Sequence, residues 1–346
     1  MATPALLWQL IDEGSRHVRC LLCPHACHIA DGATGRCRMR KNTGGALYSL
    51  SSGCIAAANL DPVEKKPLFH FLPGTRTFSL GTPGCTMSCT FCQNYTLSQG
   101  RPQESTLEDA RAAFIVESAL RERADSISFT YNEPTVSIEL IHAVAPRAVA
   151  RGLPCILVSN AFVTPTCMDL LRPMVHGVNF DLKSFSDHFY RTYCGARLEP
   201  VLETMETAVR YGWWVELTTL LIPGLNDSDA ELRAMAAFIR KRLGRDVPWH
   251  LSRFRPMYKM LDVPPTPVAS LERARDIGLK EGLRFVYTGN VPGHDGESTY
   301  CPDCGALIVR RRGYRLESPV RCMCPQCAYE VPGVWFPHML ALPAAS

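Results

Sequence analysis

The chain has 346 residues, of which 46% are hydrophobic and 20% are charged, and its formal net charge is +4. This composition is typical of a globular protein, and the charge is too small for this length to indicate nucleic-acid binding. No run of about 20 apolar residues appears, and the N-terminus lacks the basic and apolar regions of a signal peptide. We therefore expect a cytoplasmic protein without a membrane span.

Sixteen residues are cysteines. Twelve of them form three tight groups, and the remaining four stand alone at Cys54, Cys155, Cys167 and Cys194. In a large chain without an export signal, grouped cysteines indicate metal binding or catalysis rather than a disulfide framework. The four single cysteines are interpreted as small buried hydrophobic residues.

The first group lies in "RCLLCPHACHIADGATGRCRMR" and is spaced C-x2-C-x3-C-x9-C: Cys20, Cys23, Cys27 and Cys37. Four thiolates close a coordination site, so a structural zinc ion and an auxiliary iron–sulfur cluster both fit. Zinc is slightly favoured because Cys-Pro knuckles are common in zinc sites, and a disulfide pair is the remaining alternative. Residues 1–75 have too little apolar core of their own, so we expect a small module held by metal.

From residue 76 to 292, short apolar runs alternate with amphipathic stretches. The amphipathic stretch 107–124 predicts a helix, with Thr106 and Asp109 as its cap. Alternating strands and helices predict parallel β-α units, but the pattern leaves open whether they form a barrel or a doubly wound sheet. The predicted strands are 77–82, 126–131, 155–160, 177–183, 215–223, 249–254 and 284–289.

The second cysteine group follows the first predicted strand, in "GCTMSCTFCQNY" (84–95). Cys85, Cys89 and Cys92 are spaced C-x3-C-x2-C. Each iron of a [4Fe–4S] cluster needs one outside ligand, so three cysteines leave one iron open to a substrate or cofactor. The alternatives are a structural zinc site with a fourth ligand from elsewhere, and cysteines without a shared role.

This spacing resembles the signature of radical S-adenosylmethionine (SAM) enzymes. The resemblance implies that SAM binds the fourth iron through its amino and carboxylate groups. It also implies that one electron from the cluster cleaves SAM to methionine and a 5′-deoxyadenosyl radical, which abstracts hydrogen from a substrate. The implied fold is a partial (β/α)6-type, TIM-like barrel over residues 76–292, extended by the strand 284–289.

The same resemblance implies that residues at the ends of the later strands hold SAM. Glu133 matches the carboxylate that binds the SAM ammonium, although the two residues before it depart from the family pattern. Asp181 and Lys183 lie two apart, so they project to one side of a strand near the SAM carboxylate. The alternatives are local: a cap, a turn, or core packing. The predicted SAM-binding residues are Phe91, Asn132, Glu133, Ser159, Asn160, Asp181, Lys183 and His250.

The third cysteine group lies within residues 293–346, in "CPDC" and "CMCPQC". Two C-x2-C knuckles at this separation are close to the zinc-ribbon pattern, and Cys322 is left as a spare thiol. A ribbon alone does not determine a partner. The predicted zinc ligands are Cys301, Cys304, Cys324 and Cys327.

Further stretches, including "DPVEKKPLFHFLPG" (61–74) and "YTGNVPGHDGESTYCPDCG" (287–305), resemble the radical SAM enzyme of the AmmeMemoRadiSam system. This subgroup is similar to pyruvate formate-lyase activating enzymes. The resemblance implies Memo-type and Ammecr-type protein partners and reduction by flavodoxin or ferredoxin, but no particular substrate. Two alternatives stay open: a glycyl-radical-enzyme activase that acts on a partner protein, and a zinc-rich nucleic-acid-binding or scaffold protein.

Overall fold

A sheet of eight strands forms the centre of the computed structural model, which describes residues 2–102 and 111–340. Its order is β14-β13-β12-β11-β10-β9-β8-β7, and the seven strands from β8 to β14 pair in parallel. The strands are β7 (Ala57–Pro62), β8 (Arg76–Gly81), β9 (Ser126–Phe129), β10 (Cys155–Ser159), β11 (Gly177–Asp181), β12 (Trp214–Leu221), β13 (Trp249–Arg253) and β14 (Val286–Gly289).

Consecutive strands are neighbours along the whole sheet. This order winds in one direction, as in a barrel, whereas a doubly wound sheet reverses its strand order part-way across. The two outer strands, β7 and β14, are not neighbours in this order, so the described chain forms an open, partial barrel. All seven predicted strands are confirmed to within a few residues, and β14 is the predicted extension.

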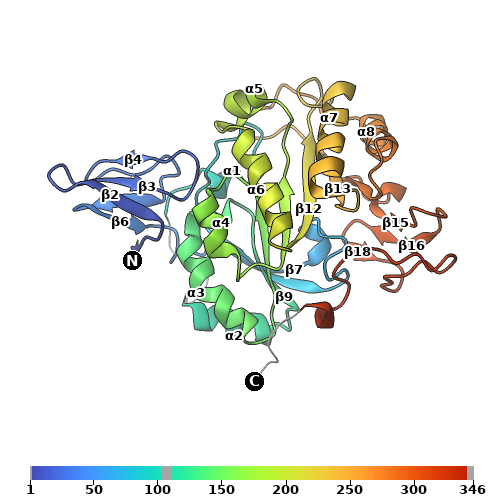
Figure 1. Ribbon diagram of the computed structural model, residues 1–346, viewed down its shortest axis with the longest axis horizontal. Coiled ribbons are helices and arrows are strands. Elements are labelled where there is room, and N and C mark those ends of the chain that lie inside the picture. The colour runs from blue at the N-terminus through green and yellow to red at the C-terminus, as the bar shows by residue number, and fades with distance from the viewer. Residues whose placement is uncertain (1, 103–110, 341–346) are drawn as a thin grey trace.

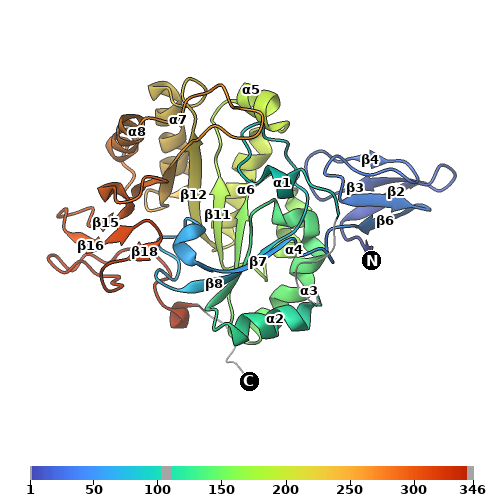
Figure 2. The same cartoon turned by 180° about the vertical axis from the view of Figure 1, so that it is seen from behind.

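The helices cover the outer face of this sheet, as Figure 1 shows from the helical side and Figure 2 from behind. The helix predicted at 107–124 is present over its described part, and its predicted cap residues lie outside the described residues. The helices are α1 (Tyr95–Ser98), α2 (Ala112–Arg121), α3 (Ile138–Val149), α4 (Pro165–Leu171), α5 (Asp187–Phe189), α6 (Glu199–Arg210), α7 (Asp229–Phe238) and α8 (Val268–Lys280), with single turns η1 (Val63–Lys65), η2 (Pro134–Ser137), η3 (Tyr190–Cys194), η4 (Ile239–Leu243), η5 (Asp295–Glu297) and η6 (Pro337–Met339).

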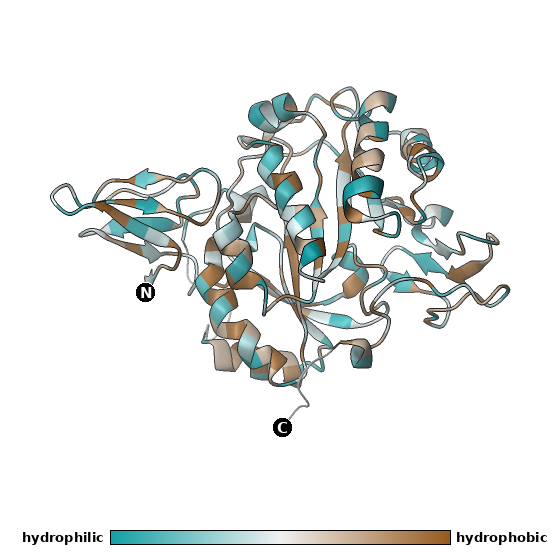
Figure 3. Cartoon of the chain, viewed as in Figure 1, coloured by the Kyte–Doolittle hydropathy of each residue, from teal (hydrophilic) through white to brown (hydrophobic). Residues whose placement is uncertain are grey.

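Burial of the strands explains their composition. All four residues of β9 are buried, and β10 and β11 are buried over most of their length, because helices cover one face and the barrel interior the other. Strands buried on both faces read as continuous apolar runs. The helices instead bury one stripe, such as Val201, Met205 and Ala208 of α6. Figure 3 shows the resulting contrast between apolar strands and mixed helices.

The N-terminal residues form two small antiparallel sheets, which project from one side of the barrel in Figure 1. The predicted N-terminal module of residues 1–75 is larger than this projection, because β7 pairs with β8 over Ala57–Gly81 and so belongs to the central sheet. The strands of the projection are β1 (Thr3–Pro4), β2 (Trp8–Asp12), β3 (His17–Cys20), β4 (His28–Ile29), β5 (Arg40–Thr43) and β6 (Ala46–Ser49).

The C-terminal residues form two short hairpins on the opposite side of the barrel (Figure 1). This part packs on the segment after β7: Leu72 and Val334 share a backbone hydrogen bond, and Arg311 donates to the carbonyl of Phe69. No helix that the structure describes has the length and apolar character that a membrane crossing requires. The strands are β15 (Thr299–Tyr300), β16 (Leu307–Val309), β17 (Arg311–Arg312) and β18 (Arg315–Leu316).

Candidate active site

A cavity of about 490 Å³ opens where the parallel strands end. Residues from the carboxyl ends of six of these strands line it, together with the loop after β8 and the segment Glu64–Phe69 that follows β7. The carboxyl ends of parallel strands are the usual location of active sites in barrels, because the loops there converge on one opening. The sequence predicted a site at the carboxyl ends of the strands, and the cavity lies there.

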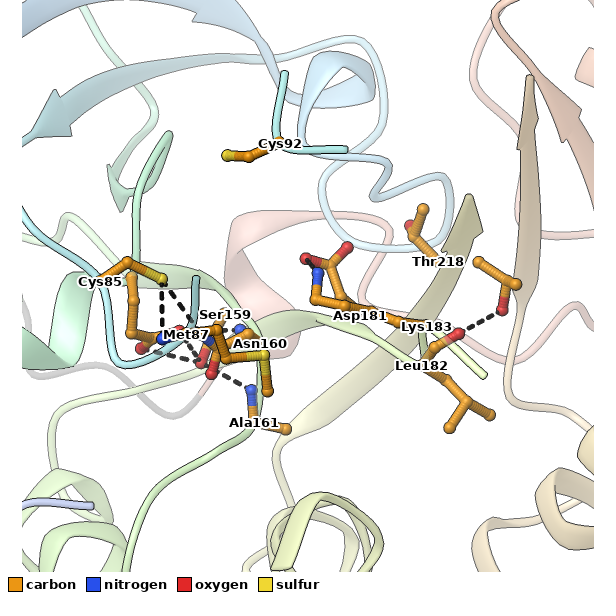
Figure 4. Close-up of polar contacts among 12 residues, drawn as sticks. Cys85, Met87, Cys92, Ser159, Asn160, Ala161, Asp181, Leu182, Lys183 and Thr218 are labelled. Carbon is orange, nitrogen blue, oxygen red and sulfur yellow. Dashed lines mark hydrogen bonds and ion pairs between the residues drawn. The ribbon is translucent and has the colours of Figure 1, made fainter. Parts of the chain in front are cut away.

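The loop after β8 carries Cys85, Cys89 and Cys92, and all three line the cavity. The backbone N–H of Met87 and the Asn160 amide donate to the Cys85 sulfur at 3.4 and 3.5 Å, as Figure 4 shows. The Cys92 sulfur lies 3.2 Å from the Ser98 hydroxyl. Such donors stabilise a thiolate, which is the form that ligates metal.

Burial raises the pKa of the Cys85 and Cys92 thiols. The pKa of Cys89 is instead lowered, first by a hydrogen bond from the Cys194 thiol and further by the charge of Lys183. Cys194 was interpreted from the sequence as a buried hydrophobic residue. It is buried, but it also contacts a predicted cluster ligand, a proximity that its isolated position in the sequence does not reveal.

The sulfur atoms of the three cysteines are not gathered as closely as the ligands of a single ion. A tetrahedral ion with bonds of about 2.3 Å holds its sulfur ligands roughly 3.8 Å apart. Among the described residues, only the C-terminal cysteines form a set of three or more possible metal ligands whose atoms all lie within 4.8 Å of one another. Cys85, Cys89 and Cys92 are not in such a set, so their three sulfurs do not all lie within 4.8 Å of one another.

Asn132 and Glu133 lie in the loop that follows β9, but only Asn132 lines the cavity. The Asn132 amide donates to the carbonyl of Gly84 at 2.7 Å, which ties the two strand ends together. Glu133 is 1% exposed and accepts from Thr135, from the Ser159 hydroxyl and from the backbone N–H of Asn160. The structure thus places Glu133 beneath the cavity floor, and its contact with SAM stays a prediction.

Ser159 and Asn160 have different surroundings although they are adjacent. The Ser159 hydroxyl donates to Glu133, whereas Asn160 lines the cavity and donates to Thr86 and Cys85. Figure 4 shows the contact between Asn160 and Cys85. Because Glu133 accepts from the Asn160 backbone at 2.8 Å, the buried carboxylate fixes the position of an amide that reaches Cys85.

Asp181 and Lys183 line the cavity together, as predicted from their spacing. The Lys183 ammonium lies 2.8 Å from the Asp181 carboxylate (Figure 4). Burial alone would lower the pKa of Lys183, but Asp181, Cys89 and Cys194 outweigh it, so the pKa stands well above its usual value. A permanently charged ammonium therefore faces the cavity beside the cysteine loop.

Phe91 and His250 also line the cavity. Phe91 is buried and its ring lies 5.7 Å from that of Phe189. The His250 ring bonds to the Glu216 carboxylate at 2.7 Å, so the two interpretations of this histidine, cavity wall and satisfied core residue, both describe it. Glu216 has no sequence signal: it is fully buried and also accepts from the N–H groups of Phe69 and His70.

Sequence reasoning missed a charged wall of the cavity. Lys65 and Lys66 both bond to Asp61, at 2.8 and 2.7 Å, and the Tyr131 hydroxyl donates to the same carboxylate. Burial lowers the pKa of Lys66 to about 8. The signal was present in "DPVEKKP", where a lysine pair follows an aspartate, but only the pairing of β7 with β8 brings this segment to the cavity.

The sequence profile of the radical SAM superfamily matches residues 79–236. An uncharacterized protein of Methanocaldococcus jannaschii is 43% identical over 307 residues, which cover 89% of this chain and 91% of the relative. The chain belongs to the radical SAM superfamily. A second uncharacterized protein of the same organism is 23% identical over 78% of this chain and 76% of the relative.

The fold agrees with this assignment. A radical SAM methyltransferase from Sphaerobacter thermophilus has a TM-score of 0.50 and 16% identity, covering 84% of this chain and 77% of that chain. At this identity the similarity shows the fold alone. The chain is a radical SAM enzyme, and the [4Fe–4S] cluster and SAM are the cofactors of its superfamily.

The C-terminal module of this radical SAM enzyme brings its four predicted ligands together. Cys301 lies 3.5 Å from Cys327, and Cys304 lies 3.5 Å from Cys324, sulfur to sulfur. All four sulfurs lie within 4.8 Å of one another, close to the roughly 3.8 Å of a tetrahedral ion. The predicted convergence of two knuckles is confirmed, and Cys322 is outside the set.

Proposed function

We propose that this enzyme cleaves SAM reductively at a [4Fe–4S] cluster held by Cys85, Cys89 and Cys92, and that its substrate enters the same cavity. The observation that carries the proposal is the opening of three thiols of one loop into one cavity. The bound cluster and SAM supply a 5′-deoxyadenosyl radical that abstracts hydrogen from the substrate. The protein's part is to orient SAM and to keep solvent away from the reaction.

The cavity residues match the charges of SAM. The Lys183 ammonium offers a cation for the SAM carboxylate, and Asp181 next to it offers an anion for the ammonium or sulfonium. The Asn132 and Asn160 amides add neutral donors beside the cysteine loop. Phe91 offers an apolar wall to the adenine. The predicted roles of these residues stay proposals.

The experiment is formation of 5′-deoxyadenosine by anaerobically reconstituted enzyme with SAM and dithionite. We expect product from the native enzyme and from a Cys322→Ala control, and none from Cys89→Ala. Absence of product from native enzyme that carries a full complement of iron at the loop would contradict the proposal. So would zinc in place of iron at Cys85, Cys89 and Cys92.

The finer proposal is that the chain is the radical SAM enzyme of an AmmeMemoRadiSam system, with Memo-type and Ammecr-type partners and a flavodoxin or ferredoxin as electron donor. The resemblance to that subgroup supports it. Two segments that carry the resemblance line the cavity, through Glu64–Phe69 and through Thr288, Gly289, Asn290 and Glu297. The segments that carry the resemblance therefore line the cavity that we propose for SAM and substrate.

A partner titration tests this finer proposal. We expect a purified Memo-type or Ammecr-type protein to increase 5′-deoxyadenosine formation above the level without partner. A Lys65→Ala variant, changed at the half-exposed end of the charged wall, should weaken that increase. A stable glycyl radical on a partner, detected by electron paramagnetic resonance, would instead support an activase similar to the pyruvate formate-lyase activating enzymes.

We further propose that the C-terminal cysteines bind zinc. Their spacing suits one tetrahedral ion, and such an ion would hold together two hairpins whose strands have only two or three residues. We expect one zinc per chain that is lost in Cys301→Ala and kept in Cys322→Ala.

A further inference from the structure

We propose that Cys20, Cys23, Cys27 and Cys37 hold a second [4Fe–4S] cluster, through which single electrons reach the site in the barrel. A reduced flavodoxin- or ferredoxin-type donor supplies each electron, which the second cluster accepts and then releases without forming or breaking a covalent bond. The cluster assignment stands independently of the proposed function, whereas the relay role rests on it.

The first observation is the spacing of the four thiols. The sulfurs feel one another's charge, since Cys20, Cys27 and Cys37 each contribute to the electrostatic environment of Cys23. Yet, within the described chain, no three of them come within the 4.8 Å that the C-terminal set satisfies. Like the barrel triad, the N-terminal set lacks the narrow spacing that suits one tetrahedral ion, and its four thiolates are the number that the four irons of a cluster need.

The second observation is that each sulfur has a backbone donor. The N–H groups of Leu22, His25 and Met39 point at the thiols of the cysteines two positions earlier, and the Arg36 N–H reaches the Cys27 sulfur at 3.4 Å. The same i+2 contact occurs in the barrel triad, from Met87 to Cys85, and in the C-terminal set, from Gln326 to Cys324. Such donors favour thiolates, so the loop is built to hold sulfur in its anionic form.

The third observation is a buried cation beside the thiols. Arg40 is 0% exposed and pairs with Glu139 at 3.1 Å. Its Nε and Nη1 groups have no hydrogen-bond acceptor within the described chain, which is costly for a buried guanidinium. Arg40 lies close enough to Cys20 and Cys37 for its charge to act on both thiols. An anionic cluster with its inorganic sulfides supplies the missing acceptors.

The position of the module supports the relay. The His25 ring bonds to the carbonyl of Thr86, the residue after Cys85, at 2.8 Å. Gly84 has a φ of 97°, and a Cβ there would lie 2.2 Å from the Met39 side chain and 3.4 Å from the Cys37 carbonyl. The chain thus requires glycine at 84 so that the N-terminal loop can press on the cysteine loop.

This contact joins the two cysteine groups from outside the cavity. None of the four N-terminal cysteines lines the cavity, so the second cluster leaves the place of SAM and substrate free. Because electron transfer falls steeply with distance, a centre packed on the back of the loop suits delivery of electrons without access to the radical.

The first test uses the full chain with Cys85, Cys89 and Cys92 all changed to Ala, which removes the barrel site. After anaerobic reconstitution we expect about four irons per chain and, after dithionite, the electron paramagnetic resonance signal of a reduced [4Fe–4S] cluster. A Cys54→Ala change added to this variant is the matched control, since Cys54 is a cysteine outside the set. It should leave the iron content and the electron paramagnetic resonance signal unchanged. Zinc at the N-terminal site, or no metal there, would overturn the assignment.

The second test addresses the relay in the holoenzyme. A Cys20→Ser/Cys27→Ser variant should lose about four irons and keep the barrel cluster. We expect photoreduced flavodoxin to reduce that remaining cluster at least tenfold more slowly than in the native enzyme, with dithionite reduction unchanged. Equal rates with flavodoxin would overturn the relay. If this variant does not fold, the triad variant still decides whether the cluster exists, and neither measurement depends on SAM cleavage.

Discussion

Replacement of Glu133 by Gln separates two roles for this residue. The carboxylate is buried and accepts from the Thr135 hydroxyl at 2.8 Å, from Ser159 at 3.0 Å and from the Asn160 backbone at 2.8 Å. Gln is nearly isosteric, but one of its two terminal atoms is an NH2 group. When the remaining oxygen keeps Thr135 and Ser159, the NH2 group faces the Asn160 N–H, donor against donor.

The expected cost follows from that single lost contact. A hydrogen bond to a charged group contributes about 1.5–3 kcal/mol, and the burial cost of the carboxylate that Gln removes offsets part of the loss. We therefore expect the free energy of unfolding to fall by about 2 kcal/mol. Displacement of the Asn160 amide, which reaches Cys85 at 3.5 Å, should also weaken SAM binding modestly.

Denaturant unfolding of the anaerobic holoenzyme measures the free energy of unfolding. Equilibrium dialysis with SAM measures the SAM dissociation constant. Glu117→Gln is the control, because Glu117 pairs with Arg151 at the surface and such pairs contribute about 0–1 kcal/mol. An unchanged unfolding free energy together with a SAM dissociation constant raised tenfold or more would refute the reasoning. That result would mean that the Glu133 carboxylate faces SAM.

Three further outcomes follow. Lys183→Met should raise the SAM dissociation constant at least tenfold, about 1.4 kcal/mol, whereas the exposed Arg233→Met should not, by equilibrium dialysis. Lys66 has a pKa of about 8 when folded and 10.5 in the unfolded reference, so the unfolded state binds more protons between these two pH values. The free energy of unfolding of the native enzyme should therefore rise from pH 8 to 10.5 relative to that of Lys66→Met. A difference between the two proteins that does not change with pH would contradict this prediction. Chelation of the C-terminal metal should remove one zinc and lower the thermal midpoint, with the same response in Cys322→Ala and no response in Cys301→Ala.

The sequence by itself determined the parallel strands, the three cysteines and the residues at the strand ends. These are local signals: a strand buried on both faces must be continuously apolar, and cluster ligands from one loop must be close in the chain. Asp181 and Lys183 could be paired because residues two apart in a strand share a side. The two C-terminal knuckles were likewise recognisable from spacing.

Tertiary structure decided what depends on contacts between distant segments. The consecutive strand order resolved the choice between a barrel and a doubly wound sheet, because strand pairing leaves no trace in the local pattern. The tertiary structure also placed Glu133 under the cavity floor and brought Lys66 into the cavity wall. Cys194 beside Cys89, and Arg40 beside the N-terminal thiols, are contacts over long sequence separations. The charges and donors around each sulfur come from such contacts, so the sequence supplies the ligands while the fold determines what surrounds them.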